Sequence, residues 1–200
     1  MNFFALFAFG ALIGSVYCDN ECFRSVFGCK GSSENSTMCS AGRKQFGCIL
    51  NKAIECKMGF TEDAKKVMKL MENTCTEGKA MTRLFNQNQK CFNLSINDKK
   101  CKSIIENIIL DNSMNFIQTN KLLCRKLDTY TECIIESVVD NCGRGVKSFF
   151  SHIFDRLVTL SRSICDEIIL PADDTDEDDD NVGNFSPFSI LVNFFERIRE

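Results

Sequence analysis

Residues 124–165 decide the fold class of this chain, and they read CRKLDTYTECIIESVVDNCGRGVKSFFSHIFDRLVTLSRSIC. Thr129 and Glu132 have the spacing of a capping box, in which each side chain bonds to the backbone of the other residue, so a helix is predicted to begin at Thr129. Glycine adopts the left-handed conformation at little cost, and we expect Gly143 and Gly145 to end this helix. The stretch therefore predicts two helices joined at a glycine break.

The helix after the break has a wide apolar face. Its large apolar side chains fall within less than half a turn, and they are Val146, Phe149, Phe150, Ile153, Phe154, Leu157, Leu160 and Ile164. This spacing is typical of an amphipathic helix. Burying such a side chain contributes roughly 1.5–3 kcal/mol, so we expect the face to lie in the core; a face that binds lipid is the alternative. His152, the only histidine of the chain, lies on the opposite, polar face.

Cys133 and Cys142 are predicted to bond to different helices. They lie nine residues apart, and steps of about 100° per residue place them on opposite sides of a helix, with roughly 13 Å of rise between them. A disulfide requires Cα atoms within about 7 Å of each other, so these two cannot bond together. The helix that carries them must therefore be tethered on two sides.

The first residues of the chain resemble an export signal. Residues 1–18 carry no charged side chain and are apolar from Phe3 to Tyr17, which predicts a secretory signal peptide that is cleaved before Asp19. Removal of Cys18 reduces the 13 cysteines to an even number. In a secreted chain this predicts a disulfide framework of undetermined connectivity. Its members are Cys22, Cys29, Cys39, Cys48, Cys56, Cys75, Cys91, Cys101, Cys124, Cys133, Cys142 and Cys165.

The remainder of residues 19–170 has helical periodicity and no strand-like alternation. We expect one helix to begin at Ser40 and end near Gly59, a second to be capped by Thr61, a short third to end at Cys91, and a fourth to start near Asn97. The predicted fold class is therefore all-α: a disulfide-stapled helical bundle.

The end of the chain has a different character. Residues 19–170 carry a net charge of +4 and residues 171–200 a net charge of −7. The acidic run repels itself and buries no apolar area, so residues 171–185 are predicted to be a disordered linker. Ser186 and Pro187 favour the start of an amphipathic helix over 186–200. Such a short helix needs a surface to dock on, either the body or a partner. Its docking face consists of Phe188, Leu191, Val192, Phe195 and Ile198.

Two sequons predict N-linked glycans at Asn35 and Asn93. Their use would place both asparagines on surface loops.

The sequence lacks the motifs that mark several kinds of functional site. No cysteine pair has the C-x-x-C spacing of zinc sites, and the acidic run does not fit a calcium-binding loop. No Gly-x-Ser-x-Gly motif accompanies the single histidine. A basic groove interleaved with aromatic side chains is also missing. We therefore predict a protein that is not an enzyme and has no metal, no cofactor and no nucleic-acid partner.

The cysteine ladder resembles that of a family of secreted arthropod and nematode proteins, which includes the insect twenty-seven-kilodalton haemolymph glycoproteins. The matching residues are Cys75-Thr76-Glu77-Gly78, Phe85, Cys91-Phe92, Cys124, Cys133, Cys142-Gly143 and Cys165. The resemblance covers residues 22–165 and implies a secreted, helical, disulfide-bonded and commonly glycosylated domain with no established activity. The segment from Pro171 onward departs from this pattern.

Three functional interpretations follow from these features. The first is an extracellular protein that binds another protein in a body fluid or secretion. The second is a carrier that holds an apolar small molecule between Phe-rich helices. The third, a toxin or membrane-active effector, depends only on the terminal segment, and the acidic residues upstream of it disfavour binding to anionic lipid.

Overall fold

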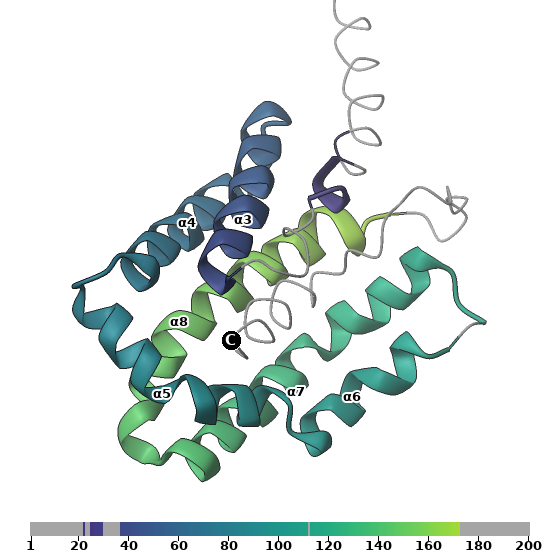
Figure 1. Ribbon diagram of the computed structural model, residues 1–200. Coiled ribbons are helices and arrows are strands. Elements are labelled where there is room, and N and C mark those ends of the chain that lie inside the picture. Colours follow the sequence, from purple (N-terminus) through teal and green to yellow (C-terminus); the bar gives the residue numbers. More distant parts are fainter. Residues whose placement is uncertain (1–21, 23–24, 30–36, 112, 173–200) are drawn as a thin grey trace, which may run out of the picture.

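The computed structural model describes Cys22 and residues 25–29, 37–111 and 113–172 (Figure 1). These residues contain no strand. The elements are α3 (Met38–Glu55), α4 (Thr61–Cys75), α5 (Ala80–Ile96), α6 (Lys99–Ile109), α7 (Phe116–Cys142), α8 (Arg144–Ile164) and the π-helical turn η2 (Cys165–Ile169). The all-α fold is confirmed. The predicted signal peptide, the terminal helix and all of the acidic linker except Pro171 and Ala172 lie outside the described residues.

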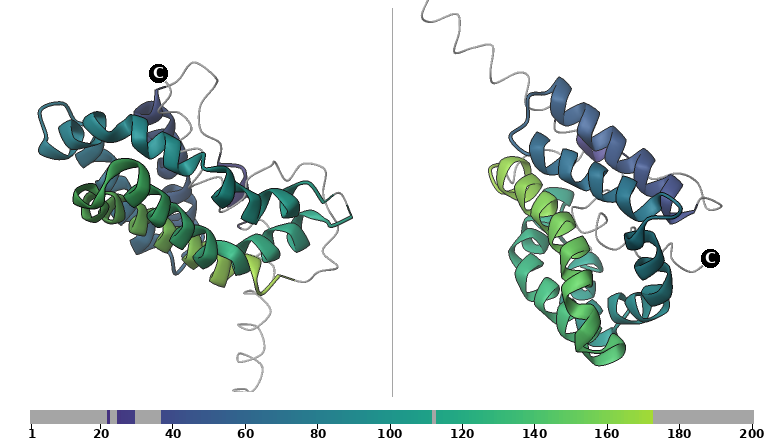
Figure 2. Two further views of the ribbon diagram at one scale, coloured as in Figure 1. Left: turned by 90° about the horizontal axis from the view of Figure 1, so that it is seen from below. Right: turned by 90° about the vertical axis from the view of Figure 1, so that its left-hand side faces the viewer.

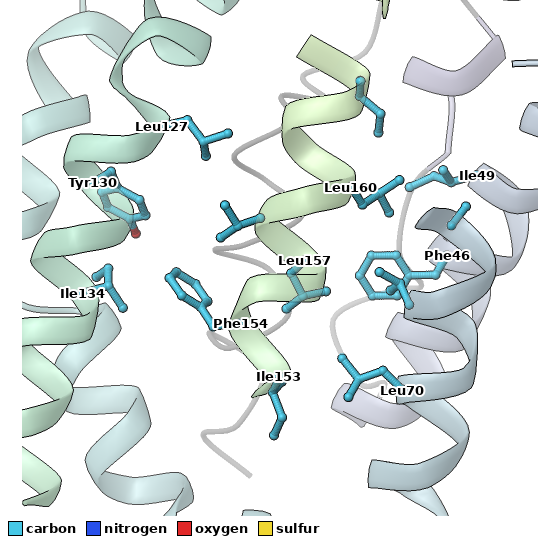
Figure 3. Packing of buried hydrophobic residues seen from close by; sticks show 14 of the residues in the cluster. Phe46, Ile49, Leu70, Leu127, Tyr130, Ile134, Ile153, Phe154, Leu157 and Leu160 are labelled. Atoms are coloured by element: carbon cyan, nitrogen blue, oxygen red, sulfur yellow. The ribbon is translucent and has the colours of Figure 1, made fainter. Parts of the chain in front are cut away.

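Helix α8 lies between α4 and α7 and contributes to the packing of both (Figure 3). Leu157 and Leu160 point toward α3 and α4, whereas Phe154 points toward Tyr130 on α7. The predicted apolar face is buried from Phe150 to Ile164, and its first two members, Val146 and Phe149, are half-buried. The face is wide because α8 has neighbours on two sides.

Two antiparallel hairpins flank α8. Helix α3 packs on α4, and α6 packs on α7 (Figure 1). Helix α5 also packs on α7, and Figure 2 shows α5 and α6 in succession along it. Gly42 allows the close approach of α3 and α4, since a Cβ atom there would lie 2.6 Å from Met71 Cε.

The cysteines from Cys22 to Cys165 all form disulfides. The pairs are Cys22–Cys56, Cys29–Cys48, Cys39–Cys75, Cys91–Cys142, Cys101–Cys133 and Cys124–Cys165. Cys133 bonds to α6 and Cys142 bonds to α5, so α7 is tethered on two sides as its helical geometry requires. Cys124 bonds to Cys165, which joins the middle of α7 to η2.

The predicted helix start at Thr129 is wrong. Helix α7 begins at Phe116, where Asn115 and Gln118 form a capping box, and it runs unbroken to Cys142. Thr129 lies inside this helix and is exposed. A capping box acts only where backbone N–H groups lack helical partners. The groups near Thr129 already have partners, because the residues before it are also helical.

Other predicted boundaries shift by a few residues. Helix α3 begins after Thr37, whose hydroxyl accepts a hydrogen bond from the Ser40 N–H, and ends at Glu55 rather than near Gly59. Helix α5 continues past Cys91 to Ile96, and Asp98 caps α6. Thr61 does not cap α4, because its hydroxyl donates to the carbonyls of Ala53 and Met58.

The turn that leads into α4 is held by a residue from the far end of the fold. Glu167 in η2 accepts hydrogen bonds from the backbone N–H groups of Gly59 and Phe60, at 2.7 and 3.1 Å. A carboxylate suits this position, since the N-terminus of a helix carries partial positive charge. A Cβ atom at position 59 would lie 3.0 Å from a Glu167 carboxylate oxygen, which explains the glycine. The contact joins η2 to the start of α4.

Candidate functional site

Large apolar side chains are exposed at the tip of the α6–α7 hairpin. Ile109 is 53% exposed and Leu110 is 72% exposed. The chain then turns, with the Met114 N–H donating to the Asp111 carbonyl, so Met114 lies close to them. Met114 and Leu122, which are both half-buried, line one hollow at the start of α7. We call Ile109, Leu110, Met114 and Leu122 the hairpin tip.

Basic side chains border the hairpin tip. The hollow, of about 250 Å³, is also lined by Gln118, Lys121 and Arg125. Lys121 and Arg125 are four residues apart on α7, so these like charges lie on one face of the helix. Lys121 Nζ donates to the Ala172 carbonyl at 2.5 Å, and the described part of the chain therefore ends beside this face. An apolar patch with a basic border suits a partner that combines apolar and acidic side chains.

A second hollow of about 260 Å³ lies between α4 and α8. It is lined by Asp63, Lys66, His152, Asp155, Arg156 and Thr159. Lys66 and Ser163 donate to the Asp63 carboxylate at 2.7 and 2.8 Å. Partial burial raises the pKa of Asp63, but these hydrogen bonds outweigh it and hold that pKa below its ordinary value. The hollow mixes charges of both signs, and it can bind polar groups at the surface.

Two observations concern the cysteines and the potential metal ligands of the described residues. Their cysteines are all oxidised to disulfides, which removes the thiolate that attacks substrates or binds metal. The part of the chain that the structure describes holds no cluster of three potential metal ligands. His152 is exposed on the polar face of α8, where the sequence places it.

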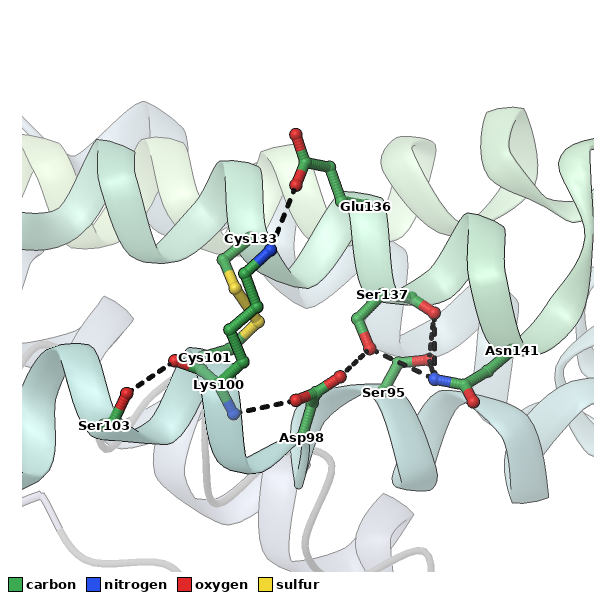
Figure 4. Close-up of a disulfide and its surroundings, with 9 residues drawn as sticks. All are labelled: Ser95, Asp98, Lys100, Cys101, Ser103, Cys133, Glu136, Ser137 and Asn141. Atoms are coloured by element: carbon green, nitrogen blue, oxygen red, sulfur yellow. Dashed lines mark hydrogen bonds and ion pairs between the residues drawn. A yellow bond between two sulfur atoms is a disulfide. The ribbon is translucent and has the colours of Figure 1, made fainter.

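A partly buried polar network joins α5, the start of α6, and α7 (Figure 4). The Ser95 hydroxyl donates to the Ser137 carbonyl at 3.1 Å and accepts from the Asn141 side-chain amide at 3.2 Å. The Ser137 hydroxyl donates to Asp98 at 2.8 Å. These bonds satisfy polar groups that would otherwise be costly to bury. The Cys101–Cys133 disulfide joins α6 to α7 close to this network.

Asn93 does not lie on a surface loop, and that expectation is wrong. It belongs to α5, is half-buried, and accepts a hydrogen bond from the Asn97 side chain through its own side-chain oxygen. The expectation followed from the assumed use of the sequon, since glycans are attached at the surface. Asn35, the other predicted glycan site, and the docking face from Phe188 to Ile198 lie outside the described residues.

The network predicts a dependence of stability on pH. Hydrogen bonds from Ser137 and from the Lys100 N–H hold the pKa of Asp98 below its ordinary value. A lowered folded-state pKa stabilises the fold above about pH 4, and this contribution is lost as the pH falls through the folded value. Asp98→Ala should therefore lower the free energy of unfolding by about 1–2 kcal/mol at pH 7, since it also removes the cap of α6. The deficit should shrink below pH 4.

Urea unfolding of the oxidised protein at pH 7 and pH 3 measures this effect. Asp98→Asn is the control, because it keeps a capping side chain without a charge. A deficit of Asp98→Ala that stays the same at both pH values would show that the carboxylate charge plays no part.

The helical periodicity of the sequence does not predict that the hairpin tip is exposed. Ile104, Ile105, Ile108 and Ile109 have helical spacing, which places all four on one inward face. Only Ile105 is buried, Ile104 and Ile108 are half-buried, and Ile109 is exposed. Helix α6 packs chiefly on α7, so the core covers only part of its apolar arc. The only indication of this site in the sequence is that two apolar residues, Ile109 and Leu110, stand directly before Asp111 at the end of the helix.

Two further observations bear on the class of protein. Among the described residues, no helix is both long and apolar enough to cross a membrane. Comparison of the chain with protein-family models, curated proteins and solved structures finds no match.

Proposed function

We propose that the chain is a secreted protein that acts by binding another extracellular protein, and that the hairpin tip is its contact surface. The observations that carry this proposal are the exposure of Ile109 and Leu110 at the turn of the α6–α7 hairpin and the basic hollow that Lys121 and Arg125 line on α7. Apolar side chains that a fold leaves exposed together with a charged border are typical of interaction sites.

The disulfides support an extracellular location. Such bonds persist in oxidising compartments and are rare in the cytosol. All twelve cysteines from Cys22 to Cys165 are paired, which is the even number that remains after cleavage before Asp19. The family resemblance points in the same direction.

The packing between the helices favours a protein partner over an apolar ligand. A carrier needs a pocket that is lined by apolar side chains. Phe92, Phe150 and Phe154 instead pack against one another, with ring centroids 5.0 Å apart in each successive pair. The two hollows described above carry charged side chains. We therefore rank the carrier second.

The terminal segment is a candidate for the same surface. Residues 186–200 are proposed to dock on the body or on the partner. The described chain ends beside the basic side of the hairpin tip, and the acidic run follows at once. Opposite charges favour this site, and salt should weaken the contact.

Native mass spectrometry of tagged protein recovered from the fluid of its source tests the proposal. We expect a complex with a second protein that Leu110→Asp abolishes, because an apolar contact is replaced by a charge. Leu110 is 72% exposed, so this substitution should change folding stability by no more than about 0.5 kcal/mol. Leu84→Asp is the matched control, since Leu84 is 44% exposed on α5, and it should retain the complex.

The alternatives give different masses. A monomer that carries a small apolar molecule would support the carrier. A complex that survives Leu110→Asp would place the contact elsewhere, and a bare monomer would contradict binding altogether.

A further inference from the structure

The Asn93-Leu94-Ser95 sequon is folded in a way that a glycosylating enzyme cannot use. Transfer joins the Asn93 amide nitrogen to the anomeric carbon of a lipid-pyrophosphate-linked oligosaccharide. The carbon–oxygen bond to the pyrophosphate breaks, the nitrogen loses one proton, and the lipid pyrophosphate leaves. The sequon also requires a hydroxyl two residues after the asparagine, so the enzyme must contact both side chains.

Helical geometry separates these two side chains. Asn93 and Ser95 both lie within α5. Two steps of about 100° place them on nearly opposite sides of the helix. An enzyme that approaches one side of folded α5 therefore reaches the amide or the hydroxyl, but not both.

The hydroxyl is also enclosed by the fold. Ser95 is 0% exposed. Its hydroxyl donates to the carbonyls of Cys91 and Ser137, at 2.9 and 3.1 Å, and accepts from Asn141. Releasing it would break the polar network between α5 and α7.

A disulfide holds this region closed. Cys91 lies one helical turn before Ser95, and Cys142 follows Asn141 directly. The bond between Cys91 and Cys142 fixes α5 against α7 at the Ser95–Asn141 end of the network. Local opening that exposes Ser95 must therefore strain or break this bond.

We infer that Asn93 accepts an oligosaccharide only while the chain is unfolded, and that closure of α5 on α7 ends its modification. Occupancy at Asn93 then records whether the transfer preceded folding. In the cell, this inference rests on the proposed passage of the chain through the secretory pathway. The experiment below uses purified components and does not depend on that passage.

The test uses unglycosylated full-length protein and a purified oligosaccharyltransferase with its lipid-linked donor. Peptide mass spectrometry measures occupancy at Asn93 for the oxidised protein and for protein that has been reduced and alkylated. Because a folded site reacts only through rare openings, we expect at least about tenfold lower occupancy in the oxidised protein. Asn93→Gln should remove the signal in both forms and so identifies the site.

A second comparison separates the local disulfide from general stability. Cys91→Ser/Cys142→Ser should raise occupancy at Asn93 in oxidised protein, whereas Cys29→Ser/Cys48→Ser should not. Equal occupancy of the oxidised and reduced wild-type forms would overturn the inference, even if the disulfide variants fail to fold. Both results are independent of whether the chain is exported in its source, so failure here leaves the proposed function unaffected.

Discussion

Phe150→Asp will prevent the chain from reaching its disulfide-complete form. Phe150 is 1% exposed, and its ring centroid lies 5.0 Å from those of Phe92 on α5 and Phe154 on α8. Truncating a buried phenylalanine costs about 3–5 kcal/mol, and a buried carboxylate without a partner adds several more. The total approaches or exceeds the stability of a typical domain, which is about 5–15 kcal/mol.

Secreted yield and alkylation of free thiols, measured without reduction, detect this loss. His152→Ala is the control on the same helix, because His152 is exposed and its removal should leave both measurements unchanged. Normal secretion of fully oxidised Phe150→Asp protein would show that α8 does not form the core of the fold.

Removal of the Cys124–Cys165 disulfide should also have a large effect. The bond closes a sequence separation of 41 residues, and the loop-entropy relation gives about 4 kcal/mol for such a loop. We expect Cys124→Ala/Cys165→Ala to lower the free energy of unfolding by about this amount. The bond also holds η2, whose Glu167 accepts hydrogen bonds from the Gly59 and Phe60 amides, so without the bond these two amides should exchange faster.

Urea unfolding and amide hydrogen exchange measure the two consequences separately. Cys29→Ala/Cys48→Ala serves as the control, because it removes a bond of sequence separation 19 and leaves η2 attached. It should lower stability by about 3 kcal/mol, with no selective change at Gly59 or Phe60. Unchanged exchange at both amides in the Cys124→Ala/Cys165→Ala variant would mean that η2 is positioned without the disulfide.

Much of this fold could be predicted from the sequence, because helical periodicity is a local property. The buried face of α8 follows from the spacing of its phenylalanines and leucines. The opposite orientations of Cys133 and Cys142 follow from the geometry of one helix, and these residues do bond to α6 and α5.

One error is local, because the capping box that starts α7 lies at Asn115 and Gln118 instead of Thr129, and the others arise where distant residues decide the outcome. Thr129 and Glu132 have the spacing of a capping box, but the residues before them are helical, so no free N–H group remains to be capped. The turn before α4 is held by Glu167, 108 residues after Gly59, and no local pattern indicates this contact. The burial of Ser95 depends on Ser137 and Asn141, which lie on another helix. The disulfide pairs and the exposed hairpin tip likewise depend on which helices meet.

Disulfide mapping of protein purified from its natural source tests most directly whether the chain is a helical body stapled in an oxidising compartment. Proteolysis without reduction, followed by mass spectrometry of the linked peptides, identifies each pair. We predict Cys22–Cys56, Cys29–Cys48, Cys39–Cys75, Cys91–Cys142, Cys101–Cys133 and Cys124–Cys165, with no free thiol from Cys22 to Cys165. A direct Cys133–Cys142 bond or a reactive thiol among these cysteines would contradict the account.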